Sequence, residues 1–153
     1  RLIVPGLYGY VSATKWLQEI ELNTWEDFDG CWVPRGWCKT GPIKTQSRID
    51  YPRKGEQITG KPAVAAGVAW APTRGISGVE VRFNNGPWIS AQLTTPLSDG
   101  AWVQWKVETE IAPGDYTVAV RATDGMGQTQ TSEVSEPAPD GATGYHQIDF
   151  VAV

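Results

Sequence analysis

The sequence has few of the residues that most often carry chemistry. Among its 153 residues are one histidine, two cysteines and one methionine. A zinc site needs three or four such ligands and a Ser-His-Asp triad needs a histidine held by a carboxylate, so neither is indicated. We expect His146 to be a strand-edge residue bonded to backbone. No glycine-rich phosphate loop of the G-x-G-x-x-G or Walker type occurs.

Charge and hydropathy exclude two further classes of partner. The net charge is −4 and the basic residues are scattered, which argues against nucleic acid because phosphates require a clustered basic surface. No apolar run reaches the roughly 18–20 residues that cross a bilayer, so we expect no membrane contact from this segment. The chain starts at Arg1 without an initiator methionine or a signal-peptide pattern. We therefore expect it to be one part of a longer protein.

The sequence is rich in tryptophan, with eight residues, and in short alternating apolar runs. Asn84-Asn85-Gly86-Pro87 separates two such runs and predicts a hairpin. In the run 63–70, Val64, Ala66, Val68 and Trp70 share one face. The whole pattern predicts a mainly β, antiparallel sandwich of the immunoglobulin-like class from 44 to 153. Its expected strands are 45–50, 63–70, 79–83, 88–93, 103–111, 116–122 and 146–152.

Two local patterns refine this prediction. The turn 112–115 precedes Tyr116 at the start of a late strand, where the ring packs inward and the hydroxyl bonds to upstream backbone, as at the tyrosine corner of such sandwiches. Asp124-Gly125, followed by Gly127, lacks the spaced carboxylates of a calcium loop and predicts a hairpin turn.

The first 43 residues differ from the rest. Residues 2–4 predict a short buried strand, and the alternation at Ile20 and Leu22 predicts another with both side chains inward. Residues 23–43 are irregular and contain three tryptophans and both cysteines. Such a segment is typical of a linker packed between domains.

Cys31 and Cys38 lie seven positions apart in this irregular segment. They are compatible with a disulfide, with two reduced thiols, or with half of a metal site whose other half is missing. Metal is the least favoured because no further cysteine or histidine lies nearby. The bends at Gly30, Pro34 and Gly36 favour the disulfide, which would imply an oxidising compartment.

The N-terminal motifs resemble those of a known family. Arg1 before Val4-Pro5-Gly6, with a loop ending in Lys15-Trp16-Leu17, resembles the closing stretch of the molybdopterin domain of the sulfite oxidase family. Residues 37–53 resemble the beginning of that family's C-terminal dimerisation domain, an immunoglobulin-like (E-set) sandwich. The resemblance divides the chain into the end of an α+β molybdopterin domain (1–22), a connecting segment (23–43) and the dimerisation domain (44–153).

The resemblance also implies a set of binding residues. Arg1, Ala13, Thr14 and Lys15 match positions that contact the pterin phosphate and ring system, Ala13 and Thr14 partly through backbone groups. Molybdenum-molybdopterin would be the cofactor of the parent protein, with none bound to this part alone. The metal-ligating cysteine of the family lies upstream, so Cys31 and Cys38 do not inherit that role. Val103 stands where vertebrate-type members have a basic residue in the anion pocket, which puts sulfite as the substrate in question.

The implied function is therefore that of a non-catalytic part of an oxidoreductase. Its partners would be the molybdopterin domain of the same chain and a second copy in a homodimer. The parent would be extracytoplasmic or anchored to a membrane through its N-terminal part. The alternative is a carbohydrate-binding or adhesion module in which Trp88, Trp102 or Trp105 stacks on sugars.

Overall fold

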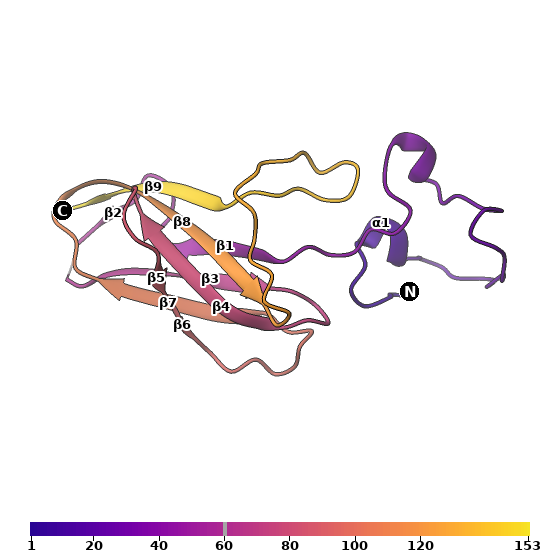
Figure 1. The fold of residues 1–153 in the computed structure, drawn as a ribbon, viewed down its shortest axis with the longest axis horizontal. Coiled ribbons are helices and arrows are strands. Elements are labelled where there is room, and N and C mark those ends of the chain that lie inside the picture. Colours follow the sequence, from indigo (N-terminus) through magenta and orange to yellow (C-terminus); the bar gives the residue numbers. More distant parts are fainter. Residues whose placement is uncertain (60) are drawn as a thin grey trace.

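The computed structural model describes residues 1–59 and 61–153, and its main body is a sandwich of two β-sheets (Figure 1). One sheet has the strand order β1-β3-β7-β6 and the other β2-β9-β8-β4-β5. All neighbouring strands are antiparallel except β2 and β9. The strands are β1 (Gln46–Tyr51), β2 (Gln57–Ile58), β3 (Ala63–Trp70), β4 (Ile76–Phe83), β5 (Ile89–Ser90), β6 (Gln92–Leu93), β7 (Val103–Thr109), β8 (Gly114–Asp124) and β9 (His146–Ala152).

This strand order is that of the immunoglobulin fold. Naming the strands A to G along the chain puts A, B, E and D in one sheet (β1, β3, β7, β6) and C, F and G in the other (β4, β8, β9). The short strands β5 and β2 extend the second sheet at its two edges. The mainly β sandwich expected from the alternating runs is therefore confirmed.

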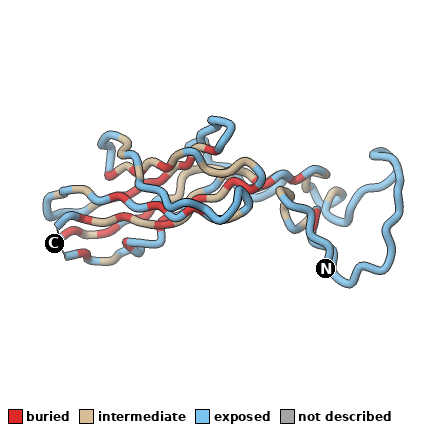
Figure 2. The backbone as a smooth tube through the Cα atoms, turned by 90° about the horizontal axis from the view of Figure 1, so that it is seen from below, coloured by how far each residue is buried: buried red, intermediate tan, exposed pale blue. Residues whose placement is uncertain are grey.

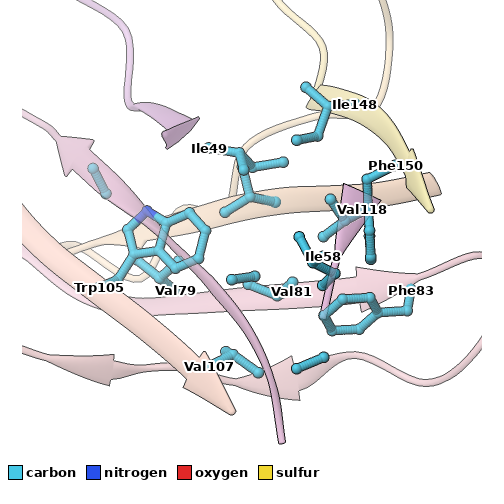
Figure 3. Packing of buried hydrophobic residues seen from close by; sticks show 14 of the residues in the cluster. Ile49, Ile58, Val79, Val81, Phe83, Trp105, Val107, Val118, Ile148 and Phe150 are labelled. Atoms are coloured by element: carbon cyan, nitrogen blue, oxygen red, sulfur yellow. The ribbon is translucent and has the colours of Figure 1, made fainter. Parts of the chain in front are cut away.

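The core lies between the inner faces of the two sheets (Figure 3). Val81, Val118 and Val120 have no exposed surface, and Trp105 of β7 points its ring inward with 2% exposed. Opposite Trp105, β3 carries Gly67, where an added Cβ would lie 2.8 Å from the indole and 1.9 Å from the backbone oxygen of Arg48. The tryptophan therefore occupies the space that a side chain at position 67 would need.

On β3 the smaller residues face the core. Ala63, Ala65 and Ala69 are buried, whereas the face shared by Val64, Ala66, Val68 and Trp70 is the outer one and only partly covered. This leaves an apolar stripe along the outside of the four-stranded sheet. Its flanks carry the charged pairs Arg48–Asp50 on β1 and Lys106–Glu108 on β7.

Two elements differ from the sequence prediction. The strand expected at 88–93 is two short strands in different sheets, because β5 pairs with β4 and β6 pairs with β7. Ala91 lies between them, and its N–H still donates to Val79 O at 2.9 Å. The alternation of side chains cannot reveal this change of sheet. The short strand β2, which precedes Pro62, was not expected.

The predicted hairpin at residues 84–87 and the predicted tyrosine corner at Tyr116 are both confirmed. Asn84 adopts a positive φ of 52°, and Gly86 N–H donates to Phe83 O at 3.0 Å, closing the hairpin between β4 and β5. The Tyr116 hydroxyl donates to Ala112 O at 3.0 Å, which is the tyrosine-corner contact.

Residues 1–42, here called the arm, lie beyond one end of the sandwich (Figure 1) and are mostly exposed (Figure 2). Their regular elements are the short helix α1 (Gly9–Ser12) and the 3-10 turn η1 (Val33–Arg35). Two predictions for this region are wrong. Residues 2–4 are exposed and form only one isolated bridge, from Leu2 to Thr14; Ile20 and Leu22 are 71% and 95% exposed and lie in no strand. Without a neighbouring strand their alternation has no sheet to fit.

The arm is attached to the sandwich by backbone contacts at few points. Ile43 N–H donates to Gly6 O at 2.8 Å, and Cys38 N–H donates to Pro139 O at 2.7 Å. The last residues of the connecting segment therefore lie against the sandwich. Trp25 and Trp32 are 58% and 46% exposed, and the packing of this segment between two domains stays a prediction. No helix among the described residues is long and apolar enough to span a membrane.

Candidate functional site

The residues expected to bind a pterin are gathered at the start of the arm. Leu2 and Thr14 exchange two backbone hydrogen bonds, of 3.0 and 3.1 Å, as an antiparallel bridge. The next residues outward from this bridge are Arg1 and Lys15, so the two cations occupy facing positions on neighbouring segments. The structure thus brings Arg1, Ala13, Thr14 and Lys15 together, although the two cations are fourteen positions apart in the sequence.

Both cationic side chains are exposed, and within the described residues neither forms an ion pair. Exposed apolar side chains lie close to them in the chain: Ile3 is 63% exposed and Trp16, which follows Lys15 at a positive φ of 54°, is 88% exposed. Two free cations beside uncovered apolar side chains fit an anionic group such as a phosphate attached to a flat ring system.

The two cysteines are both free thiols in the structure, where the sequence favoured a disulfide. Cys31 is exposed and Cys38 is half-buried. No group of three or more metal-ligating side chains occurs among the described residues.

A buried ionic cluster, which sequence reasoning missed, fixes the point where the chain enters the sandwich. Arg74 Nε lies 2.9 Å from Asp124 Oδ2, and Arg74 Nη2 donates to Ile43 O at 3.1 Å. Thr45 Oγ1 donates to the same carboxylate at 3.1 Å. The sequence did contain an indication of this cluster. The side chains of Val118, Val120 and Ala122 alternate inward, and the same alternation places the carboxylate of Asp124 on the inner face of the sheet.

The electrostatics of Asp124 follow from these contacts. Burial by itself would raise the pKa of Asp124, since its side chain is 2% exposed. The N–H groups of Gln128 and Met126 donate to Oδ1 at 3.0 Å each, and together with Arg74 and Thr45 they outweigh burial and lower the pKa. Asp124 therefore stays ionised, and its carboxylate stabilises the predicted hairpin turn by accepting the hydrogen bonds from Met126 and Gln128.

His146 lies beside a hollow of about 950 Å³ between the arm and the loop preceding β9. Its Nδ1 accepts a hydrogen bond from Ile49 N–H at 3.0 Å, which confirms the structural role expected for it. Burial lowers the pKa of His146, and the charge of Arg48 lowers it further against the opposing effect of Asp50. A neutral imidazole whose acceptor nitrogen is occupied by backbone has little freedom to act as a base.

The three tryptophans of the carbohydrate alternative have different environments. Trp105 is buried and cannot stack on a ligand, so this part of the alternative is wrong. Trp88 is covered by the guanidinium groups of Arg82 and Arg121, 4.7 and 4.2 Å from its ring centroid. Trp102 is 49% exposed but stacks on Trp70 at 5.8 Å. Of these three, a sugar platform would depend on Trp102.

Comparisons with known proteins support the fold. The chain matches no family model, and no curated protein is significantly similar to it. Its structure is similar to the sulfane dehydrogenase SoxCD from Paracoccus pantotrophus, with a TM-score of 0.55 and 21% identity, over 69% of this chain and 30% of that chain. It thus spans less than a third of that neighbour.

Two weaker likenesses are to CopC from Methylosinus trichosporium OB3b and to an endo-beta-1,4-mannanase from Thermotoga petrophila. The CopC match has a TM-score of 0.40 and 10% identity, over 71% of this chain and 93% of that one. The mannanase match has a TM-score of 0.44 and 12% identity, over 72% and 20%.

Proposed function

We propose that this chain is the C-terminal dimerisation domain of a molybdenum-cofactor oxidoreductase of the sulfite oxidase family, and that it is itself non-catalytic. The observation that carries the proposal is the likeness of this chain to part of SoxCD, which is named as a sulfane dehydrogenase. The motifs around Arg1 and Lys15, which resemble the family's pterin loop, agree with it independently. The parent would lie outside the cytoplasm or be anchored to a membrane.

The arm supports the proposal because its apolar side chains lack cover. Every residue from 13 to 32 is exposed, including Trp16, Leu22 and Phe28. Apolar groups are rarely left uncovered in such number, since each would gain free energy by leaving water. An upstream molybdopterin domain of the same chain would supply the missing surface.

In the parent, Arg1 and Lys15 would hold the pterin phosphate, with backbone groups of Ala13 and Thr14 beside the ring system. Bound molybdenum would supply two-electron or oxygen-atom transfer, and this chain would contribute binding and support. Arg1→Ala and Lys15→Ala in the longer protein should lower its molybdenum content. The control is Lys54→Ala, which changes an exposed lysine of the sandwich. Unchanged metal content in both variants would refute the cofactor role.

The homodimer is proposed to form through the apolar stripe on the four-stranded sheet. Val64, Ala66, Val68 and Trp70 are partly exposed there, and Trp102 extends the patch. Each flank carries both a positive and a negative side chain, so a second copy related by a two-fold axis could match opposite charges.

Sedimentation of the 153-residue chain at increasing concentration tests this surface. We expect a dimer that Val68→Asp dissociates, because a carboxylate in the interface would lose its hydration. The matched control is Gln147→Asp on the exposed side of the other sheet. A monomer at all concentrations, or equal weakening by both substitutions, contradicts this interface. Polysaccharide binding that Trp102→Ala abolishes would instead favour the carbohydrate-binding alternative.

A further inference from the structure

Cys31 and Cys38 lie on either side of a tight reversal of the chain. The 3-10 turn η1 (Val33–Arg35) is capped by Gly36, whose φ of 90° and ψ of 15° are left-handed. Gly36 N–H donates to Val33 O at 3.0 Å, and Trp37 N–H donates to Trp32 O at 3.2 Å. This nested pair of hydrogen bonds is the Schellman motif, in which the chain turns back after a helical turn.

The reversal determines where the two thiols lie. Since Trp32 and Trp37 are joined by a backbone hydrogen bond, Cys31 and Cys38 are the next residues outward on its two legs. The indole rings of Trp32 and Trp37 meet edge to face at 6.3 Å and hold the legs together. A disulfide requires Cα atoms about 4.4–6.8 Å apart, and closing the bond needs Cys31 and Cys38 to come within that range.

The two thiols differ in their surroundings. Arg35 Nη1 lies 3.1 Å from Cys31 Sγ and also donates to the Cys31 carbonyl oxygen. Cys31 is exposed, so an external reagent reaches a sulfur that already faces a positive charge. Cys38 is half-buried and lines a hollow of about 320 Å³ together with Trp25 and Lys39. Exposure and a neighbouring cation are the two features of cysteines that react first in thiol–disulfide exchange.

We propose that Cys31 and Cys38 form a reversible thiol–disulfide pair that closes by exchange with an external disulfide. The Cys31 thiolate attacks one sulfur of that disulfide, forms a mixed disulfide and releases the first thiol. The Cys38 thiolate then attacks Cys31 Sγ, closes the internal bond and releases the second. Two protein thiols and one external disulfide thus give one protein disulfide and two external thiols, so the external disulfide takes up both electrons.

Closing this bond would act on the attachment of the arm. Cys38 N–H donates to Pro139 O in the sandwich at 2.7 Å, and the Trp37 ring packs on Tyr10 at 4.6 Å. A bond from Cys38 back to Cys31 would hold the reversal closed beside both contacts, without touching a residue of the core. The pair is therefore inferred to set how firmly the exposed part of the arm is held, independently of the proposed function.

The test uses the 153-residue chain equilibrated with oxidised glutathione at low protein concentration. We expect both thiols to disappear from a thiol titration, with a mass two hydrogens lower and one internal bridge between Cys31 and Cys38 in the peptide map. Cys38→Ser should stop at a glutathione adduct on Cys31. Two thiols that remain titratable, or a wild-type chain that stops at adducts, would refute the pair.

The role of Arg35 has its own control. Arg35→Gln should slow the first exchange step, and added salt should slow the wild type but not this variant. Arg53→Gln, an exposed arginine in the sandwich, should leave the rate unchanged. Equal rates for the wild type and Arg35→Gln would overturn the role of Arg35 in the first exchange step.

Discussion

The sandwich and the arm contain similar apolar residues, but the sandwich buries them and the arm leaves them exposed. Trp105 in the sandwich is 2% exposed and Trp16 in the arm is 88% exposed. Among residues 1–42 only Ser12 and Gly41 are buried, whereas the sandwich buries side chains from both of its sheets. Apolar content alone therefore does not produce a core; paired strands are needed to bring alternating side chains onto one inner face.

The sharpest test of this contrast compares the two tryptophans. Trp105→Ala should lower the free energy of unfolding by about 3–5 kcal/mol, because it leaves a cavity beside Gly67. Trp16→Ala should change it by about 0.5 kcal/mol or less, since no core contact is lost. Denaturant titration followed by circular dichroism measures both. Similar losses in the two variants would mean that the arm shares the core of the sandwich.

The ionic cluster at the junction of the two regions should have the next largest effect. Asp124→Asn leaves Arg74 without its carboxylate and should cost about 3 kcal/mol. The matched control is Asp50→Asn, which breaks the exposed pair with Arg48 and should cost about 0–1 kcal/mol. Thermal unfolding at neutral pH measures the two losses. A cost no larger than that of the control would show that the cluster contributes little.

The same cluster predicts an acid limit to the stability of the sandwich. Because the folded pKa of Asp124 is lowered, its contribution is complete above the unfolded pKa of about 4 and is lost as pH falls through the folded pKa. The unfolding temperature of the wild type should therefore approach that of Asp124→Asn at low pH. If the gap between them stays constant from neutral to acid pH, the cluster is not titrating.

His146 should give a smaller effect at higher pH. Its folded pKa is lowered, so below the unfolded pKa of about 6.5 the unfolded chain takes up a proton that the folded protein resists. Stability should thus fall as pH decreases from about 6.5 toward the folded pKa. His146→Gln should lose about 1 kcal/mol at neutral pH with the Ile49 hydrogen bond and should flatten this slope. An unchanged slope would assign it to other groups.

The smallest effect on the sandwich should come from loosening the arm. Tyr8 packs against Gly141, where an added Cβ would lie 2.6 Å from the tyrosine hydroxyl. Tyr8→Ala should speed proteolysis within residues 13–32 and leave the unfolding temperature of the sandwich almost unchanged. Tyr51→Ala, an exposed tyrosine at the end of β1, serves as the control for protease susceptibility. A large drop in unfolding temperature for Tyr8→Ala would contradict the separation of the two regions.

The same contrast explains which parts could be predicted from the sequence. The strands of the sandwich were predictable because buried residues recur every second position, as at Val118, Val120 and Ala122. The change of sheet at Ala91 was not, because alternation is the same in either sheet. In the arm, Ile20 and Leu22 alternate as a strand would but have no partner to pair with. A local alternation forms a strand only where the chain also provides a neighbouring strand to pair with it.

In the candidate site, Arg1, Ala13, Thr14 and Lys15 were singled out by a resemblance, and their pterin-binding role stays a prediction. Their proximity depends on the bridge between Leu2 and Thr14, which no local periodicity reveals. The Arg74–Asp124 pair joins two residues 50 positions apart. The sequence indicated it only through the alternation of β8, which places the side chain of residue 124 on the inner face.

The hydrogen bond from Cys38 N–H to Pro139 O has a consequence for the order of folding. It joins residues 101 positions apart, and the loop that carries Pro139 lies between β8 and β9. Closing so long a segment is entropically costly until β8 and β9 have paired. During synthesis the arm emerges before the sandwich, and the loop that carries Pro139 emerges only after β8. We therefore expect the arm to dock after the strands of the sandwich have paired.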